Sequence, residues 1–319
     1  MATGCVPGKL VRAIVYPLLT AGIIGIGPAD WWLCDLFANL RLHVMAGLLL
    51  TIPVIATGPQ RFLLAACLIA FCWGTFSMLR QSNGASFAEL EGHPVLSIMS
   101  FNLGRRPDIG DVFIAHLDAT SPDLLVLQEF GRQSADLLAA LEARYPYSVL
   151  EERDDSFGIA MYSRHPLVDA EVLHFASSGI PFLRASVRSD GETLDVLGIH
   201  LQWPMTPSSF RERNRQIDVL EKLIMNRSRP AVLCGDWNLT PWSGHYHEVT
   251  SGDLSDSGRA DRFRPTWPTY LLLPGIAVDH CFVTYPLVVA DKSIGPPSGS
   301  DHRPITTQIS TLSETLGER

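Results

Sequence analysis

Acidic, amide and imidazole side chains recur along the last two-thirds of this 319-residue chain, each beside a short apolar run. In chain order they are Asn102, Glu129, His200, Asp236, Asn238, Asp279, Asp301 and His302. The apolar runs have the composition of β-strands, and polar residues at strand ends are typical of active sites built on sheets. We therefore expect these side chains to form one site.

The residue types in this set suit hydrolysis of a phosphoester. Carboxylate and amide oxygens are the ligands that hard cations such as Mg²⁺ or Mn²⁺ prefer. Histidine suits proton transfer and contact with phosphate near neutral pH. The reaction needs neutralised phosphoryl oxygens, an oriented water and a proton for the leaving oxygen, and this set can supply all three. The sequence shows no serine elbow and no cysteine–histidine pattern for covalent catalysis.

Each motif also has a structural explanation when it is taken alone. Asp236 could form an Asx turn after a strand, and Glu129 could cap the N-terminus of a following helix. His200 could be a buried histidine at the end of a sheet, and residues 301–302 could form an ion pair in a loop. The presence of all these motifs in one region favours the catalytic interpretation. Other histidines lack such a context and are expected to be structural or exposed, namely His165, His174, His245 and His247.

The segments that must position these residues alternate between strand-like and helix-like patterns. The helical period of residues 208–226, which begin with two serines, predicts the clearest helix. Further helices are expected over 108–117 and 134–144, and strands over 95–101, 123–127, 159–162, 168–174, 182–187, 194–200, 231–234, 277–284 and 305–309. Mixed strands and helices around one large core predict an α/β sandwich.

The order of the motifs resembles the endonuclease/exonuclease/phosphatase superfamily, which includes deoxyribonuclease-I-like nucleases, sphingomyelinases and inositol polyphosphate phosphatases. The matching segments are Ser100-Phe101-Asn102, Leu127-Gln128-Glu129, Ile199-His200, Gly235-Asp236-Trp237-Asn238, Val278-Asp279-His280 and Ser300-Asp301-His302-Arg303-Pro304. The resemblance spans residues 95–309, with every motif in family order. It implies a four-layer α/β/β/α sandwich with the site at one rim of the two sheets.

The resemblance implies a metal site that holds Mg²⁺ or Mn²⁺. Glu129 matches the metal-binding glutamate, Asn102 the asparagine beside it, and Asp301 a further acidic residue near the metal. The chain departs from the usual pattern at His280, where tyrosine is common, and at Trp237, where phenylalanine is commoner. Neither position supplies a ligand, so the implied site is unaffected.

The resemblance also implies the catalytic roles. Asp236 looks like the carboxylate that orients or activates the attacking water, and Asn238 like its phosphate-contacting partner. His302 resembles the histidine that contacts the scissile phosphate, and Asp279 the carboxylate that fixes the tautomer and charge of that histidine. His200 matches a second histidine of deoxyribonuclease-like and sphingomyelinase-like members, which makes it a candidate general acid.

Three apolar stretches precede this region, at residues 13–29, 42–58 and 62–78. Each has about 17 residues, the lower end of what crosses a bilayer as a helix, and their prolines and glycines are tolerated in such spans. We therefore expect about three transmembrane helices. A cleaved signal peptide is the alternative for the first stretch, because Lys9 and Arg12 precede it.

These patterns divide the chain into an anchor over 1–80, a linker over 81–94, a catalytic domain over 95–311 and a tail over 312–319. An odd number of spans would put the two ends of the chain on opposite sides of the membrane. The basic residues on the N-terminal side would be Lys9, Arg12 and Arg61, against Arg41 and Arg80 on the other. This bias favours an extracytoplasmic catalytic domain. We expect a multi-pass protein of a bacterial-type inner or plasma membrane.

Charge helps to discriminate between substrates. Residues 95–319 carry 20 basic and 29 acidic residues, a formal charge of −9, which repels polyanions on average. We therefore expect a lipid or lipid-linked phosphate or pyrophosphate as substrate. Arg184, on an expected strand, could reach the phosphate, or it could be solvated or ion-paired. A membrane-tethered nuclease is the alternative, and an inactive scaffold a remote one; the basic groove of a nuclease would draw on Arg105, Arg106, Arg211, Arg213 and Arg215.

Tryptophan and cysteine complete the set of notable residues. Trp203, Trp242 and Trp267 flank the motifs and could line a substrate groove or pack in the core. Cys234 and Cys281 lie in strand-like apolar runs, where cysteine behaves as a small buried hydrophobe. The spacing of the cysteines predicts neither a zinc site nor a disulfide framework.

Overall fold

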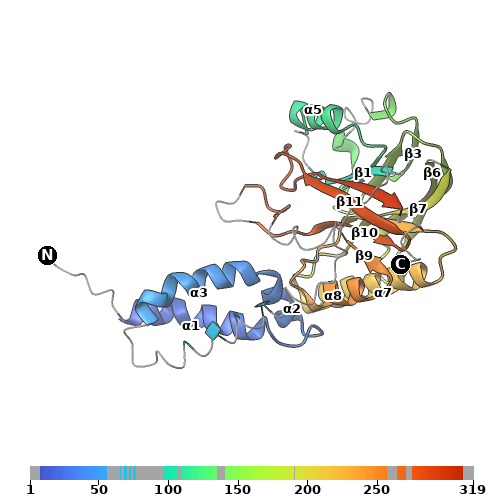
Figure 1. The fold of residues 1–319 in the computed structure, drawn as a ribbon. Coiled ribbons are helices and arrows are strands. Elements are labelled where there is room, and N and C mark those ends of the chain that lie inside the picture. The colour runs from blue at the N-terminus through green and yellow to red at the C-terminus, as the bar shows by residue number, and fades with distance from the viewer. Residues whose placement is uncertain are drawn as a thin grey trace, which may run out of the picture. The chain divides into compact units, whose positions relative to one another are not determined.

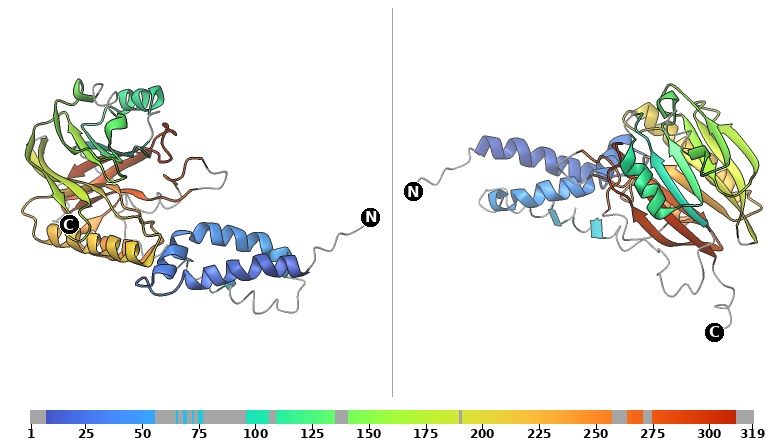
Figure 2. Two further views of the ribbon diagram at one scale, coloured as in Figure 1. Left: turned by 180° about the vertical axis from the view of Figure 1, so that it is seen from behind. Right: turned by 90° about the horizontal axis from the view of Figure 1, so that it is seen from above.

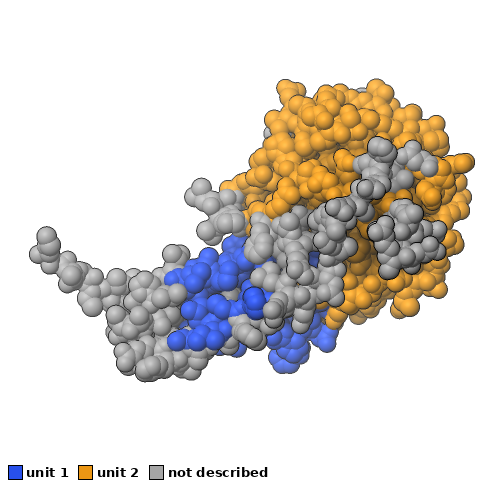
Figure 3. All heavy atoms as spheres, viewed as in Figure 1, with its two compact units in different colours: residues 1–83, 241–246 blue, residues 84–240, 247–319 orange. Residues whose placement is uncertain are grey.

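The structure is a computed structural model, and it describes residues 8–55, 65, 68–69, 72, 75–76, 96–105, 109–134, 141–189, 191–256, 264–270 and 275–311. The chain divides into two compact units (Figure 3). The first contains residues 1–83 and 241–246, and the second contains residues 84–240 and 247–319. The predicted linker at 81–94 and the predicted tail at 312–319 lie outside the described residues.

The second unit is built on two six-stranded mixed sheets (Figure 1). The first has the order β11-β12-β1-β2-β4-β3, with β1 Leu96–Asn102, β2 Leu124–Gln128, β3 Tyr147–Glu151, β4 Ile159–Ser163, β11 Leu287–Ile294 and β12 Ile305–Thr311. The second has the order β5-β6-β7-β8-β10-β9, with β5 Leu167–His174, β6 Pro181–Ser189, β7 Glu192–His200, β8 Ala231–Asp236, β9 Leu254–Ser255 and β10 Asp279–Thr284. The β1–β2 and β7–β8 pairs are parallel, and the other pairs are antiparallel.

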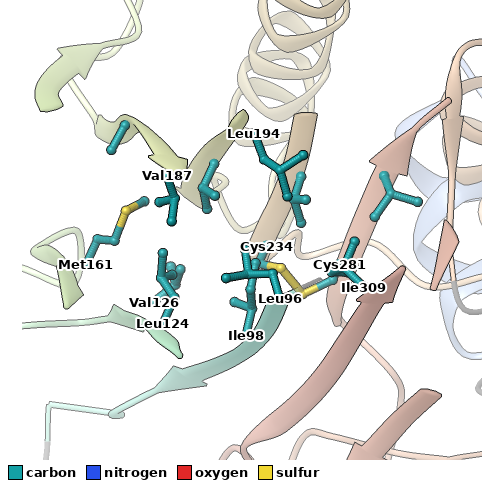
Figure 4. Packing of buried hydrophobic residues seen from close by; sticks show 14 of the residues in the cluster. Leu96, Ile98, Leu124, Val126, Met161, Val187, Leu194, Cys234, Cys281 and Ile309 are labelled. Carbon is teal, nitrogen blue, oxygen red and sulfur yellow. A yellow bond between two sulfur atoms is a disulfide. The ribbon is translucent and has the colours of Figure 1, made fainter. Parts of the chain in front are cut away.

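Apolar packing stacks these sheets face to face. One core cluster takes residues from both sheets, with Ile98 and Val126 from the first and Val187 and Leu194 from the second (Figure 4). A second cluster packs Phe113 of the helix α5 (Asp111–Thr120) against the other face of the first sheet. The helix α7 (Pro207–Met225) flanks the second sheet (Figures 1 and 2). The predicted α/β class is confirmed, and the stacked mixed sheets are consistent with the predicted sandwich.

Strand register brings the polar motifs to shared edges of the two sheets. Asn102 pairs with Gln128 in the β1–β2 ladder, and His200 pairs with Asp236 in the β7–β8 ladder. Asp236 in turn lies opposite Asp279 in the antiparallel β8–β10 ladder. These strands are buried along their length, and a slip of one residue would turn every apolar side chain to the wrong face. Core packing therefore fixes the catalytic register.

Most predicted elements occur within a few residues of their expected bounds. The helix predicted at 208–226 is α7, which starts with a capping box between Thr206 and Ser209 and with a proline in its first turn. The helix predicted at 108–117 is α5, and that predicted at 134–144 lies largely outside the described residues. The sequence patterns do not predict β3, β9, β11 or the helix α8 (Gly244–Ser251). β3 starts with two exposed residues, so it lacks an apolar run.

The two cysteines of the catalytic unit form a disulfide (Figure 4). Cys234 and Cys281 are directly opposite in the β8–β10 ladder, with their Cα atoms 4.1 Å apart. The prediction that they are separate buried hydrophobes is therefore wrong. They are 47 residues apart in sequence, and only the strand pairing makes them neighbours. The bond joins the strands that carry Asp236 and Asp279.

The first unit contains α1 (Gly8–Ile24), α2 (Trp32–Asn39) and α3 (Arg41–Ile55), and its small core includes Leu19, Val44 and Leu48. Among the described residues, no single helix is long and apolar enough to cross a membrane. Only the pair 32–39 and 41–49, bent by 65°, fits by length and composition. The three predicted spans are therefore not supported: α1 ends at Ile24, α3 has 15 residues, and residues 62–78 lie mostly outside the description.

A buried polar cluster lies within this first unit. Asn39 Nδ2 donates to Asp35 Oδ2 at 3.2 Å, and Ser243 Oγ donates to Asp35 Oδ1. Arg41 donates from Nη2 to the main-chain oxygen of Gly25 at 2.5 Å. Buried polar groups need such partners to offset their lost hydration. Residues 241–246, only a few positions after Asn238 in sequence, thus belong with the N-terminal helices.

Candidate active site

The carboxyl ends of the two parallel strand pairs supply most of the site. Nε2 of His200, at the end of β7, lies 3.6 Å from Oδ2 of Asp236, at the end of β8. Asn102, at the end of β1, donates from Nδ2 to the same Oδ2 of Asp236 at 3.0 Å and so links the two sheets. Glu129 follows β2, and its Oε1 lies 3.5 Å from Asn102 Nδ2. The structure therefore brings these predicted residues together.

The loop before β12 adds His302 to this group. Its Nδ1 lies 3.0 Å from Asp279 Oδ2, and its Nε2 lies 3.7 Å from Asp236 Oδ2. The main-chain N–H of His302 donates to Ser300 Oγ at 3.0 Å. Ser300 Oγ in turn donates to the main-chain oxygen of Asn102 at 2.7 Å. Strands of both sheets therefore hold the imidazole in place.

His302 and Asp279 form a buried ion pair. Burial would lower the pKa of His302, but the Asp279 carboxylate, with help from Asp236, raises it to about 9. Burial also opposes ionisation of Asp279, yet the charge and hydrogen bond of His302 hold the pKa of Asp279 below its usual value. An opposite charge at hydrogen-bond distance favours both charged forms. At neutral pH this pair is an imidazolium and a carboxylate.

Asp236 and His200, in contrast, both tend toward their uncharged forms. Burial raises the pKa of Asp236 to about 7, and the charge of His302 offsets only part of this effect. Burial lowers the pKa of His200 to about 4, although the nearby Glu129 carboxylate opposes the change. Low polarity disfavours each charged form here, because the imidazoles nearest to Asp236 lie 3.6 Å and 3.7 Å away, farther than Asp279 lies from His302. At neutral pH, His200 is an uncharged imidazole, and Asp236 is close to its midpoint.

Two residues of the site have left-handed backbone conformations. Glu129 has φ of 54° directly after β2, and Asn238 has φ of 48° just after β8. Such conformations cost non-glycine residues about 1–3 kcal/mol and cluster at functional sites. The main-chain N–H of Asn238 donates to Asp236 Oδ1 at 2.9 Å, and its Nδ2 donates to the oxygen of Leu201 at 2.9 Å. The strained turn thus orients Asp236 and joins the β7 and β8 ends.

The donor set fits a divalent cation. Burial raises the pKa of Glu129, and the Asp236 carboxylate adds to this effect. The half-buried Glu129 and the buried Asp236 and Asp279 place three carboxylates around one imidazolium, so full ionisation leaves two excess negative charges that a divalent cation would balance. The ligand atoms of Asp236, Asp279 and His302 lie within 4.8 Å of one another, and of these the two carboxylates, rather than the protonated imidazole, can coordinate a cation. Within the described residues, Asp279 Oδ1 is buried without a hydrogen-bond partner, which is a further unsatisfied oxygen for a cation or water.

Asp301 lies beside this group and is held by a tryptophan. Its Oδ2 accepts from Trp267 Nε1 at 2.9 Å, and its main-chain oxygen accepts from the N–H of Thr269 at 2.9 Å. The Trp267 ring lies 6.3 Å from the His302 ring. Trp242 is buried, so of the three flanking tryptophans it is the one that packs in the interior.

Sequence reasoning missed several residues that position the site. Arg213, predicted as a possible basic contact, is fully buried in α7 and donates to the main-chain oxygen of Asn238 at 3.3 Å. Gln216, one helical turn later, accepts from the N–H of Gln202 at 2.8 Å. Thr266 Oγ1 accepts from the N–H of Asp279 at 3.3 Å. The sequence signal that could have predicted this role is the three-residue spacing of Arg213 and Gln216 in α7, and this signal is weak.

Comparison with known proteins identifies similar chains. The 2',5'-phosphodiesterase 12 of Mus musculus is 27% identical over 180 residues, covering 44% of this chain and 29% of that protein, so the chain spans less than a third of the relative's length. A structure of D. rerio TDP2 humanized by 14 mutations has a TM-score of 0.58 and 21% identity, covering 68% of this chain and 99% of that chain. D. rerio TDP2 complexed with a single strand DNA product has a TM-score of 0.56 and 19% identity over the same shares.

The structural likeness, at these identities, shows the fold. Family membership comes from the sequence profile of the Endonuclease/Exonuclease/phosphatase family, which matches residues 99–302. The matched region starts in β1 and ends at His302, so it contains every residue of the site described above. The chain therefore belongs to the endonuclease/exonuclease/phosphatase family, whose members are phosphoesterases and nucleases.

Proposed function

We propose that this chain is a divalent-metal-dependent phosphoester hydrolase that acts on a lipid or lipid-linked phosphate or pyrophosphate. The observation that carries the proposal is the buried series Asn102–Asp236–His302–Asp279, in which one imidazolium lies among carboxylates. Such a series pairs a base with a phosphate-binding cation in one water-poor site. The presence of all these groups disfavours an inactive scaffold.

In this proposal, Glu129 and Asn102 hold Mg²⁺ or Mn²⁺, with Asp301 close by. The bound ion supplies positive charge that polarises a phosphoryl oxygen. Glu129 is suited to this role because its Oε1 accepts only a long hydrogen bond, 3.5 Å from Asn102 Nδ2, which leaves the carboxylate available to an ion. Asp301 already accepts the indole N–H of Trp267, so we assign it a contact near the ion rather than the main charge.

Asp236 is the proposed base for the attacking water. A pKa of about 7 lets it accept a proton near neutral pH, where a base is most effective. Its Oδ1 accepts the N–H of Asn238, so Oδ2, which faces both imidazoles, is the oxygen that meets the water. Asn238 donates one side-chain N–H to the main-chain oxygen of Leu201. Its proposed phosphate contact uses the second N–H of the same amide group.

The two histidines have different proposed roles. His302 binds phosphoryl oxygens as an imidazolium, and Asp279 fixes its tautomer because it occupies Nδ1. His200 is neutral and donates one N–H hydrogen bond to the substrate. A bound phosphoryl dianion would raise the pKa of His200, and only then could it protonate the leaving oxygen. The general-acid role of His200 is thus conditional on substrate.

A nuclease is the second candidate, motivated by the relatives: D. rerio TDP2 is known with a single strand DNA product. The charge of −9 over residues 95–319 and the burial of Arg213 weigh against it. Arg184 is 41% exposed on β6 and pairs with Glu171 at 3.7 Å, a contact unrelated to any phosphate. The substrate class is decided by a panel assay in Mg²⁺ that compares phosphate release from polyprenyl pyrophosphate and phospholipids with cleavage of plasmid and single-stranded DNA. Activity on DNA alone would reject the lipid proposal.

We also propose that the N-terminal unit tethers the protein to a membrane and that the catalytic unit faces away from the cytoplasm. Two observations support this: the apolar N-terminal stretches and the Cys234–Cys281 disulfide, because disulfides persist in oxidising compartments. Protease added to intact spheroplasts should digest the catalytic unit. Digestion only after lysis would reverse the orientation.

A further inference from the structure

The two ends of the active site differ in polarity. A series of neighbours runs from Glu129 through Asn102 and Asp236 to His302, with successive polar distances of 3.5, 3.0 and 3.7 Å. At the Glu129 end the site adjoins a polar pocket, and at the His302 end it adjoins exposed aromatic side chains. A substrate whose phosphorus lies at the middle of this series must extend toward both ends.

Two tryptophans form the aromatic end. The Trp267 ring lies 6.3 Å from His302 and 6.4 Å from the ring of Trp203, which meets it edge-on at 68°. Trp203 is 52% exposed, and Met205, whose N–H donates to the oxygen of Trp203, is 46% exposed. Tyr270, three residues after Trp267, is 62% exposed. An exposed tryptophan that packs against the tryptophan beside a catalytic histidine indicates a binding surface rather than core packing.

A pocket of about 160 Å³ forms the polar end, and its lining residues are Arg105, Glu129, Gly131, Arg132, Ser134, Arg153 and Asp154. Contacts with neighbouring groups hold its arginines: Arg105 Nη2 donates to the main-chain oxygen of Asp154 at 2.6 Å, and Arg153 bonds to Asp155. Arg132 is 81% exposed and lies 3.6 Å from Glu152. Arg153 is fully paired, with Asp155 at 2.6 Å and Glu151 at 3.1 Å, whereas Arg132 lies at the longer distances of 3.6 Å from Glu152 and 3.8 Å from Asp154. The exposed Arg132 guanidinium is therefore the group of this pocket that can take an anionic group of the substrate.

We propose that the site binds an amphipathic phosphoester, with a charged group of the substrate in the Arg105–Arg132–Arg153 pocket and an apolar chain against Trp203 and Trp267. This inference rests on the proposed hydrolase function and names its substrate class. A nucleobase fits the aromatic end less well, because the edge-on rings form a corner rather than a stacking platform.

The aromatic end is tested with alkylphosphonates of increasing chain length as inhibitors of hydrolysis of a soluble phosphodiester. In the wild type, each methylene buried against the tryptophans should tighten inhibition by about fourfold. Trp203→Ala should weaken long-chain inhibition by about tenfold and flatten the dependence on chain length. The control is Tyr285→Ala, which removes an exposed aromatic side chain from the turn between β10 and β11. Binding of the same inhibitors by calorimetry gives a readout that does not require turnover.

The polar end is tested with alkylphosphonates that do or do not carry a second phosphonate. Arg132→Ala should weaken only the doubly charged inhibitor, by about tenfold, because one charge-assisted contact is lost. Arg184→Ala is the control, since Arg184 is an exposed, ion-paired arginine outside the pocket. Inhibition independent of chain length in the wild type, or an equal loss for both inhibitors in Arg132→Ala, would overturn the inference. The hydrolase proposal fails separately, if the wild type has no metal-dependent activity on any phosphoester.

Discussion

The active site contains two carboxylate–histidine pairs of the same composition and opposite charge state. In the first, Asp279 and His302 lie 3.0 Å apart and are both ionised. In the second, Asp236 and His200 lie 3.6 Å apart, and burial favours the neutral form of each. All four side chains are buried to a similar degree. Residue type and burial are therefore alike in the two pairs, and the difference in charge state follows from the shorter distance between the carboxylate and the imidazole in the first pair.

This difference separates the tasks that hydrolysis of a phosphoester needs. A permanent imidazolium suits the binding of phosphoryl oxygens, and a carboxyl group near its midpoint suits proton transfer from water. Asp236 lies between the two imidazoles, 3.6 Å from one and 3.7 Å from the other, so each pair influences the other. Loss of the cation shared by both pairs should therefore have a larger effect than loss of any one member of either pair.

Removal of divalent metal should have the largest effect, because it takes away the charge that balances the buried carboxylates of both pairs. We expect activity to fall to background in excess EDTA and to return when Mg²⁺ or Mn²⁺ is added in excess over the chelator. Phosphate release under these two conditions is the measurement. Full turnover in EDTA would reject both the metal assignment and the charge balance inferred for the site.

Asp236→Asn should have the next largest effect. The substitution keeps size and hydrogen-bonding reach but removes the base, so kcat should fall by on the order of 10²–10⁴ while metal affinity is largely kept. His302→Ala should cost a similar amount, because phosphoryl charge is then left unneutralised. Glu129→Gln is the matched comparison: it removes a charged ligand, so excess metal should partly restore its rate. If metal rescues Asp236→Asn and not Glu129→Gln, the two roles are exchanged.

Asp279→Asn should cost less and change the pH profile instead. In the wild type, activity should rise as Asp236 ionises near pH 7, or at lower pH with metal bound, and fall as His302 loses its proton near pH 9. Loss of the Asp279 charge removes the main cause of the raised His302 pKa, so the alkaline limb should move to lower pH. The pH dependence of kcat/KM for both proteins checks this. An unchanged alkaline limb would show that Asp279 does not set the charge of His302.

The catalytic unit could be predicted further than the helical unit because its motifs mark strand ends. Asn102, Glu129, His200 and Asp236 each follow a buried apolar run, and chain order alone indicated a shared site. What could not be predicted depends on contacts between distant segments. The disulfide between Cys234 and Cys281 needs the β8–β10 pairing, and the burial of Arg213 needs the packing of α7.

The helical unit shows the limit of hydropathy as a guide. Residues 13–29 and 42–58 have the composition of membrane spans, but the chain breaks α1 at Ile24 and places a bend between α2 and α3. A polar cluster around Asp35 includes Ser243, which comes from the other end of the sequence. No local sequence pattern predicts that contact. The difference in protonation between the two carboxylate–histidine pairs could not be predicted from the sequence either, because it depends on distances between separate strands.

His200→Gln should have the smallest effect on activity, about tenfold, and it tests the comparison through stability. The folded-state pKa of His200, about 4, lies below its ordinary value of 6.5. Its contribution to stability is therefore present above pH 6.5 and lost as pH falls toward 4. His302, with its pKa raised to about 9, contributes to stability below pH 6.5 and loses that contribution as pH rises through 9.

Urea unfolding of the metal-free protein tests both contributions. His200→Gln should reduce the loss of unfolding free energy at acid pH, and Asp279→Asn should reduce the loss at alkaline pH. Equal pH dependence in both variants would mean that the two pairs do not differ in charge.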